Sequence, residues 1–182
     1  MGERLELVRI APRRVLDAGC GAGAARAVLA RRYPRGAVIG IDLAFEMLQQ
    51  AQHEGSFLAR AKSLLAGRSS RFVCGDFAQL PFAAGSFGLV WSNLALAWAA
   101  DPLPVFAEFH RVLEPGGLLM FSTYGPDTLK ELRTAFASAD ALPHTNRFID
   151  MHDLGDMLVA GGFVTPVMDM EILTLTYPDF AA

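Results

Sequence analysis

The sequence predicts an α/β fold, a mostly parallel sheet with helices on both faces. Short apolar segments alternate with amphipathic ones along the chain, and this alternation is typical of parallel strands joined by right-handed helical crossovers. The 182 residues are 52% apolar, which is enough for one compact core. The first apolar segment runs directly into a glycine-rich loop, VLDAGCGAG at residues 15–23, which indicates a ligand site at its end.

Five segments are predicted as strands, at residues 13–19, 36–42, 71–76, 86–93 and 118–124. The last of them, LLMFSTY, is continuously apolar, as expected for a strand covered on both faces. Helices are predicted at residues 24–33, 44–52 and 102–113, with a further short helix around 57–65. Pro34 and Gly36 end the first helix, and the turn-forming sequence EPGG at 114–117 is expected to end the last.

Composition excludes several classes of protein. The formal net charge of −3 argues against nucleic-acid binding. No apolar run is long enough to span a membrane, and the first residues lack a signal peptide. Two cysteines are too few for a disulfide framework, and neither has metal-ligand spacing. We therefore expect a cytoplasmic protein without a metal, and the oligomeric state is left open.

Acidic residues end the first three predicted strands. They are Asp17, Asp42 and Asp76. Ligands of open α/β sheets bind beyond the carboxyl ends of the strands, at the point where the strand order reverses. A single aspartate at such a position is often only a helix cap, but three in register with a glycine loop indicate a binding site.

The glycine loop itself leaves two ligands open. Gly19, Gly21 and Ala24 fit the dinucleotide pattern G-x-G-x-x-G/A, as in an NAD-dependent oxidoreductase. Asp17, however, would place a negative charge near the pyrophosphate, which binds at the helix N-terminus. An ammonium group beside Asp17 and a carboxylate at the helix N-terminus fit this charge pattern better. The loop therefore favours an amino acid zwitterion.

The residues at the other strand ends indicate further groups of this ligand. Asp42 can accept hydrogen bonds from both hydroxyls of a ribose. Asp76 can accept from an exocyclic amine, and Phe77 can cover a base. An amino acid, a ribose and an adenine together make S-adenosyl-L-methionine the predicted cofactor.

Five segments resemble the successive motifs of the class I S-adenosylmethionine-dependent methyltransferases, which have a Rossmann-like fold: VLDAGCGAG, VIGID, CGDFAQLPF, SFGLVWSNLALAW and RVLEPGGLLMFSTYGPDTL. The resemblance covers about residues 13 to 177 and implies a seven-stranded sheet with a reversed last strand. It also implies cofactor-binding roles for Asp17, Gly19, Cys20, Gly21 and Gly23 (methionine part), Asp42 (ribose), Leu43 and Met47 (adenosine packing), Asp76 and Phe77 (adenine), and Asn93 (sulfonium end).

The C-terminal segments STYGPDTLKELRTAF, PHTNRFIDMHDLGDMLVAGGF and VMDMEILTLTY resemble the malonyl-acyl-carrier-protein O-methyltransferases of biotin synthesis. A mitochondrial complex I assembly factor, described as a protein arginine hydroxylase, is similar in the same segments. The first resemblance implies an acyl carrier protein as partner. The alternatives are a cofactor-binding assembly or accessory factor, and a methyltransferase with another small acceptor.

We expect a single domain over residues 1–182. Relatives begin with a segment of the type FD-x-A-A-x-x-YD and continue past LTLTYPDF with a helix and a strand. Neither is found in this sequence, which suggests truncation at both ends and a sheet without its last antiparallel strand.

No catalytic base is assigned, because a carboxylate acceptor is already ionised at neutral pH. A malonyl carboxylate would need a cationic partner, for which Arg133 and Arg147 are the candidates, with Tyr124 and His144 as hydrogen-bond donors. The alternative for Arg147 is a surface salt bridge with Asp150 or Asp153, and the alternative for His144 is a capping or surface role. An excess of arginine near the N-terminus could meet an acidic carrier protein: Arg4, Arg9, Arg13 and Arg14.

Two tryptophans, Trp91 and Trp98, flank the end of the fourth predicted strand. We expect both to be core residues rather than a stacking surface for a base.

Overall fold

The computed structural model describes residues 1–53, 71–140 and 142–176. The chain divides into two compact units, residues 1–124 and 125–182, and each unit is described by itself. The helix predicted at residues 57–65 lies outside the described residues.

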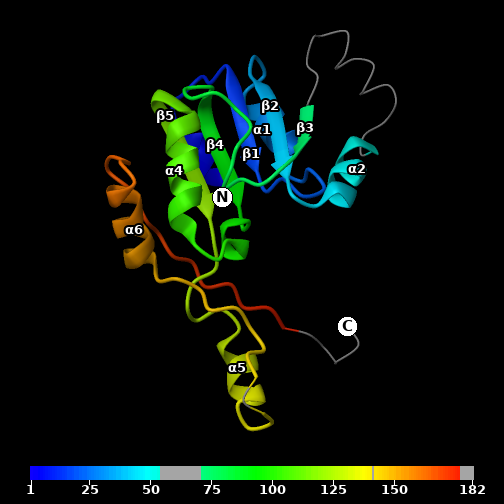
Figure 1. The fold of residues 1–182 in the computed structure, drawn as a ribbon, viewed down its shortest axis with the longest axis vertical. Coiled ribbons are helices and arrows are strands. Elements are labelled where there is room, and N and C mark those ends of the chain that lie inside the picture. Colours follow the sequence, from blue (N-terminus) through cyan, green and yellow to red (C-terminus); the bar gives the residue numbers. More distant parts are fainter. Residues whose placement is uncertain (54–70, 141, 177–182) are drawn as a thin grey trace. The chain divides into compact units, whose positions relative to one another are not determined.

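The first unit is built on a parallel sheet (Figure 1). Its strands are β1 (Arg14–Ala18), β2 (Ala37–Asp42), β3 (Arg71–Cys74), β4 (Phe87–Asn93) and β5 (Leu113–Ser122). Their order is β3-β2-β1-β4-β5, and every neighbouring pair is parallel. The strand order reverses between β1 and β4, so ligands are expected beyond the carboxyl ends of these two strands. The predicted α/β fold is confirmed, and the sheet of the described residues contains five parallel strands and no antiparallel one.

Helices cover both faces of this sheet, as predicted. On one face, the 3-10 helix η1 (Gly2–Leu7) and helix α1 (Arg26–Arg32) contribute Leu5 and Leu29 to a core cluster with Val15 and Trp91. On the other face, α4 (Pro102–Val112) lies in front of β4 and β5 (Figure 1). Its Phe106 ring lies 5.6 Å from the ring of Phe121 in β5.

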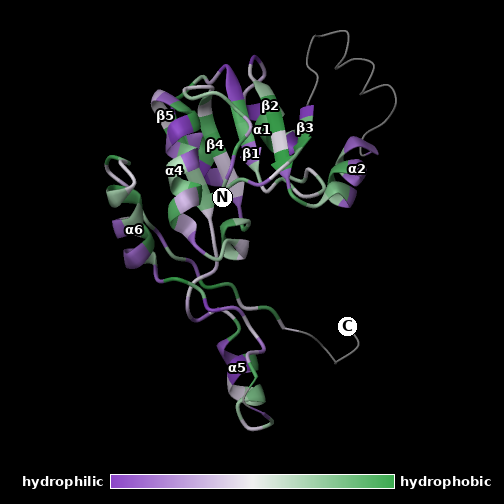
Figure 2. Ribbon diagram, viewed as in Figure 1, coloured by the Kyte–Doolittle hydropathy of each residue, from purple (hydrophilic) through white to green (hydrophobic). Residues whose placement is uncertain are grey.

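Because side chains alternate along a strand, the register also tells which face each end residue joins. Asp17 of β1 pairs with Trp91 of β4 and with Gly40 of β2. The Asp17 and Asp42 side chains therefore both point to the face that α1 covers. Figure 2 shows hydrophobic residues along β4 and mixed polar and apolar residues on the helices. Helix α2 (Phe45–His53), which follows β2 directly, buries Leu48 and Ala51.

Three sequence expectations need correction here. Residues 21–25 form turns and α1 begins only at Arg26, two residues later than predicted. The segment EPGG is not a separate turn, because it lies inside β5. Trp91 is buried as expected, but Trp98 is 80% exposed. It belongs to a short 3-10 helix, η2 (Leu96–Trp98), beyond the end of β4 and so outside the sheet.

The EPGG segment explains a shift in the β4–β5 pairing. Phe87 pairs with Leu113, but Leu89 pairs with Leu118. Residues 114–117 are therefore inserted into β5 opposite Gly88. A Cβ atom at Gly88 would lie 2.8 Å from Glu114 Oε1 and 2.9 Å from Pro12 Cβ, so a side chain at this position would require Glu114 and Pro12 to shift.

The second unit contains α5 (Lys130–Phe136) and α6 (Met151–Ala160). Asp150 caps α6 by accepting a hydrogen bond from the His152 amide at 2.8 Å. Leu154 and Leu158 are buried one helical turn apart. Among the described helices of the chain, none is long and apolar enough to cross a membrane.

Candidate functional site

The glycine loop after β1 is held against β2 by its own backbone. The amides of Gly19 and Cys20 both donate to the carbonyl of Ile41, at 2.9 and 3.1 Å. Gly19 has a φ of 74°, and a Cβ atom there would lie only 2.1 Å from Ala95 Cβ. The close packing of the segment that follows β4 thus requires a glycine at position 19.

Gly21 and Gly23 have different surroundings. Gly21, with a φ of 51°, lies near Met47, whose Cε would be 3.6 Å from an added Cβ. An added Cβ at Gly23 would meet Ala51 at 3.3 Å. The loop therefore lies against α2, with Gly21 next to Met47.

Asp17 is the most strongly perturbed acid of the site. It is only 3% exposed at the carboxyl end of β1. Burial, and secondarily the negative charge of Asp42, raises its pKa from 3.8 to about 7. A buried carboxylate is stabilised by a cationic partner, so the protein carries a position suited to an ammonium group.

Cys20 lies beside these acids. Burial and the charges of Asp17 and Asp42 raise the pKa of its thiol to about 12. The thiol stays protonated at neutral pH and is a poor nucleophile. The loop uses the backbone amide of Cys20, while its side chain fills space against Gly40, where an added Cβ would meet Cys20 Sγ at 2.8 Å.

Asp42 connects the glycine loop to α2. Its Oδ2 accepts a hydrogen bond from the Gly21 amide at 2.7 Å, and its Oδ1 accepts from the Ala44 amide at 2.9 Å. Asp42 therefore closes a turn before α2, which begins at Phe45, and it does not cap the helix itself. Each carboxylate oxygen can accept a second hydrogen bond, so this anchoring orients Asp42 without preventing it from binding two hydroxyls.

Asp76 and the apolar residues near it surround the third strand end. Asp76 is exposed and accepts a hydrogen bond from the Ala78 amide at 2.8 Å. The Phe77 ring packs 6.3 Å from Phe109 of α4 and also lies 3.8 Å from the Cβ position of Gly19. Leu43 and Met47 are 73% and 41% exposed. Apolar side chains exposed next to Asp42 suit a flat apolar ligand group such as a base.

Asn93 ends β4 and is held by the neighbouring strand. Its Oδ1 accepts from Ser122 Oγ at 2.9 Å. The next residue, Leu94, has a φ of 58°, which is unusual for a leucine. The Leu94 amide donates to the Ser122 carbonyl at 3.0 Å. These contacts hold a strained turn at the carboxyl end of β4, next to the point where the strand order reverses. Strained backbone residues are often found at functional sites.

The strain at Leu94 predicts that a glycine substitution here is more stable than an alanine substitution, the reverse of the usual order in a helix. Leu94→Gly is expected to be about 1 kcal/mol more stable than Leu94→Ala, since only the alanine retains the penalty of a positive φ. Urea denaturation of both variants measures the difference. At Leu103, inside α4, the same two substitutions should show the ordinary order, with alanine the more stable. Equal stabilities of the two Leu94 variants would contradict the prediction.

The substrate candidates have different local roles. Tyr124 follows β5 and is partly exposed. Arg133 donates to the carbonyls of Pro126 and Thr128, so its guanidinium holds the segment before α5. His144 Nε2 lies 2.8 Å from Asp140 Oδ1, and the His144 ring is stacked on a phenylalanine, Phe136.

Arg147 differs from Arg133 and His144. Within the described ranges, it makes no ion pair with Asp150 or Asp153. Asp150 is instead paired with His152 Nδ1 at 2.8 Å. The salt-bridge alternative for Arg147 is therefore not found, and Arg147 is the cationic candidate whose side chain stays available.

Two of the N-terminal arginines lie away from the carboxyl ends of the strands. Arg13 and Arg14 stand at the amino end of β1, whereas Asp17 and the glycine loop stand at its carboxyl end. A carrier protein bound to these arginines would face the opposite edge of the sheet from the site. Among residues 1–53, 71–140 and 142–176, no group of three or more potential ligands could hold a metal ion.

Comparison with known proteins identifies the family. The family model described as a methyltransferase domain matches residues 16–121, a range that runs from β1 to β5 and includes all three strand-end aspartates. This chain belongs to that methyltransferase domain family. The resemblance noted in the sequence is thereby confirmed.

Three similar proteins add detail to the methyltransferase assignment. A malonyl-[acyl-carrier protein] O-methyltransferase of Laribacter hongkongensis is 53% identical over 100% of this chain and 61% of its own length. One of Gallionella capsiferriformans is 53% identical over 98% and 61%. A solved arsenic(III) S-adenosylmethionine methyltransferase from Chlamydomonas reinhardtii is 28% identical, with a TM-score of 0.64 over 82% of this chain and 51% of that one. The chain spans about three fifths of the length of these curated relatives.

Some residues of this methyltransferase site were missed by sequence reasoning. Ser122 holds Asn93 and the Leu94 turn, but a serine at the end of an apolar strand carries no specific signal. The Ser92 hydroxyl is buried beside Asn93 without a hydrogen-bond partner in the described structure. Glu108 and Arg111 of α4 contact the loop that carries Asp76, although their spacing in the sequence indicates only a local helix pair.

Proposed function

We propose that this methyltransferase domain binds S-adenosyl-L-methionine at the carboxyl ends of β1, β2 and β3. The observation that carries the proposal is the buried Asp17, whose raised pKa marks an acid in need of a cationic partner. Asp17 would pair with the ammonium of the methionine part, and Asp42 would hold the ribose. Asp76 and Phe77 would receive the adenine, and Asn93 would lie at the sulfonium end.

We further propose that the methyl acceptor is the free carboxylate of malonyl-acyl-carrier protein, a step of biotin synthesis. Relatives at 53% identity bear that name. A carrier-protein partner would place the protein in the cytoplasm. The proposal treats residues 1–182 as one domain.

The proposed reaction does not need a catalytic base from the protein. The bound donor supplies an electrophilic methyl group, and an acceptor carboxylate is already ionised at neutral pH. The protein then has to align the acceptor and exclude water. Arg147, whose guanidinium stays available, is the residue proposed to bind the malonyl carboxylate.

Transfer of a labelled methyl group tests this function. The complete protein is incubated with methyl-labelled donor and either malonyl-acyl-carrier protein or acetyl-acyl-carrier protein, which has no free carboxylate. We expect label only on the malonyl form. Label on neither carrier, with donor binding intact, would refute the acceptor and favour an accessory factor.

Donor binding is tested separately through Asp42. Asp42→Ala is expected to raise the dissociation constant for S-adenosylmethionine about tenfold to a hundredfold, the range for lost hydrogen bonds to a charged group. Isothermal titration calorimetry measures it. Asp153→Ala on the exposed side of α6 is the control. An unchanged constant for Asp42→Ala would contradict the ribose role, and saturable NADH binding in place of donor binding would overturn the choice of cofactor.

A further inference from the structure

A segment without helix or strand connects β3 to β4 and carries Asp76 and Phe77. Residues 75–86 have little regular structure of their own. The segment is anchored at its start, where the Gly75 amide donates to the Asp42 carbonyl at 3.0 Å. Its position further along must be set by contacts with another element.

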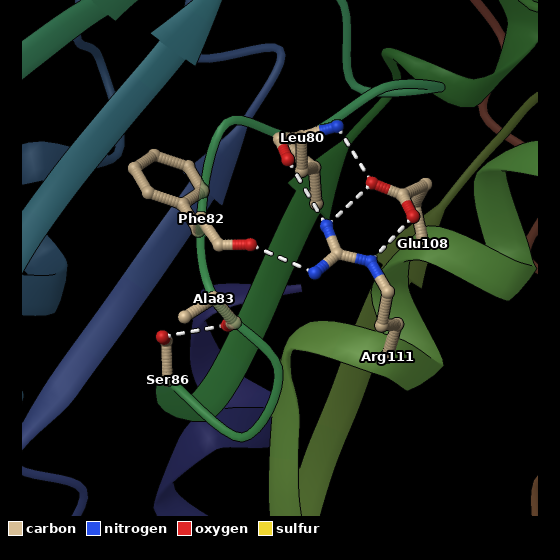
Figure 3. A network of polar contacts seen from close by, with 6 residues as sticks. All are labelled: Leu80, Phe82, Ala83, Ser86, Glu108 and Arg111. Carbon is tan, nitrogen blue, oxygen red and sulfur yellow. Dashed lines mark hydrogen bonds and ion pairs between the residues drawn. The ribbon is translucent and has the colours of Figure 1, made fainter.

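Helix α4 provides these contacts through two side chains, Glu108 and Arg111 (Figure 3). Glu108 Oε2 accepts a hydrogen bond from the Leu80 amide at 2.7 Å. Arg111 donates through Nη1 to the Phe82 carbonyl at 2.8 Å and through Nη2 to the Leu80 carbonyl at 3.0 Å. Three backbone groups of the segment are thus bound by one pair of side chains.

The pair is rigid because its members also bind each other. Arg111 Nε lies 2.6 Å from Glu108 Oε1, and Arg111 Nη2 lies 2.7 Å from Glu108 Oε2. This fork geometry uses the planar guanidinium fully, and a lysine ammonium cannot reproduce it. The hydrogen bond from Arg111 also holds the pKa of Glu108 below its ordinary value, so Glu108 stays ionised at neutral pH.

Helix α4 is itself fixed to the sheet. Phe106 and Phe109 are fully buried, and Phe109 is the residue against which Phe77 packs. The helix therefore touches the segment at Phe77, at Leu80 and at Phe82. The Glu108–Arg111 contacts lie only a few residues beyond Asp76.

We propose that Glu108 and Arg111 are positioning residues for the adenine end of the donor site, because they hold Leu80 and Phe82 and thereby fix Asp76, whereas Phe77 is held separately by its packing against Phe109. This inference rests on the proposed binding of S-adenosylmethionine. It assigns to α4, which supplies none of the predicted ligand contacts, control over how well the site recognises adenine.

Arg111→Lys tests the inference with a readout that a merely structural role would not move. Two ligands are compared by calorimetry: S-adenosylhomocysteine, and its inosine analogue, in which a carbonyl oxygen replaces the adenine amine. The wild type is expected to prefer the adenine ligand through Asp76. In Arg111→Lys we expect the affinity for the adenine ligand to fall roughly tenfold, the inosine ligand to bind nearly as before, and the preference to be lost.

A cycle with Asp76→Ala shows whether Arg111 acts through Asp76. In that background Arg111→Lys should have no further effect on the affinity for S-adenosylhomocysteine. Arg31→Lys, at an exposed position of α1, is the matched control and should bind both ligands as the wild type does. If Arg111→Lys does not fold, Glu108→Gln replaces it, because glutamine keeps an acceptor for the Leu80 amide but loses the charge that Arg111 binds.

The outcomes separate the inference from the function on which it rests. Two results would overturn the positioning role while donor binding stands. One is an equal loss of affinity for both ligands in Arg111→Lys, and the other is an undiminished effect of Arg111→Lys on the affinity for S-adenosylhomocysteine in the Asp76→Ala background. A wild-type protein that binds neither ligand would overturn the proposed function, and the inference with it.

Discussion

Asp17→Asn is expected to stabilise the ligand-free protein at pH 8 and, in the same molecule, to weaken its affinity for S-adenosylmethionine. The native carboxylate is buried with a pKa raised from 3.8 to about 7. One pKa unit corresponds to about 1.4 kcal/mol, so ionised Asp17 lowers the free energy of unfolding by up to about 4 kcal/mol at pH 8. A neutral asparagine of the same shape removes that penalty.

The destabilisation by Asp17 is expected to grow as the pH rises. Below pH 4 the carboxyl group is protonated in both the folded and the unfolded chain, and Asp17 carries no penalty. Between pH 4 and about 7 only the unfolded chain releases the proton, so stability falls as pH rises. Above about pH 7 both states are ionised and the loss is constant. The stabilisation by Asp17→Asn should therefore be large at pH 8 and small at pH 4.5.

Thermal unfolding measures the first half of this prediction. We expect the Tm to rise by up to roughly 8–16 °C at pH 8, since the penalty is up to about 4 kcal/mol and 1 kcal/mol corresponds to about 2–4 °C in a chain of this size. Asp153→Asn, at an exposed position of α6, is the control and should leave the Tm unchanged. A Tm for Asp17→Asn that falls at pH 8 would show that the native carboxylate is stabilising and that no cation is needed beside it.

Ligand titration measures the second half. The donor ammonium pairs only with ionised Asp17, so the wild-type dissociation constant should fall roughly twentyfold between pH 5.5 and pH 7.5. For Asp17→Asn, the dissociation constant at pH 7.5 should be about tenfold to a hundredfold higher than that of the wild type, and it should be nearly independent of pH. A wild-type affinity that does not change over this range would exclude a titrating Asp17 from the site.

The strand ends could be predicted from the sequence because each is marked twice, by the end of an apolar segment and by a glycine or an acid. The parallel register then brings Asp17 and Asp42 to the same edge and the same face. The contact between α4 and the Asp76 segment could not be predicted. Arg111 and Leu80 are far apart in the sequence, and a Glu and an Arg three residues apart on a helix are usually only a surface pair.

Other features that the sequence does not reveal also have physical causes. The EPGG segment has the composition of a turn, but here it is extra chain inserted into β5. Arg133 is a substrate candidate because of its charge, and in the structure its Nη1 and Nη2 donate to nearby backbone carbonyls. The sequence does not show whether an arginine binds the backbone of its own loop or a substrate.

Gly19→Ala is expected to cause the largest loss of stability of the variants considered. The new methyl group would lie 2.1 Å from Ala95 Cβ, and the backbone would keep a φ of 74°. Overpacking costs about 1–3 kcal/mol and a positive φ about 1–2 kcal/mol. The free energy of unfolding in urea should therefore fall by roughly 3–4 kcal/mol.

Two further variants separate these causes. Gly116→Ala has a φ of 78° with no atom within 4 Å of the new Cβ, so it measures the backbone cost alone, about 1–2 kcal/mol. Ala95→Gly removes the methyl group that clashes, and the nearest remaining atom, Ala95 Cα, lies at 3.5 Å. The double variant of Gly19→Ala and Ala95→Gly should then recover about 2 kcal/mol relative to additivity. Strict additivity would mean that Gly19 is required for something other than this contact. The ligand that the glycine loop is proposed to bind would then be the next explanation to test.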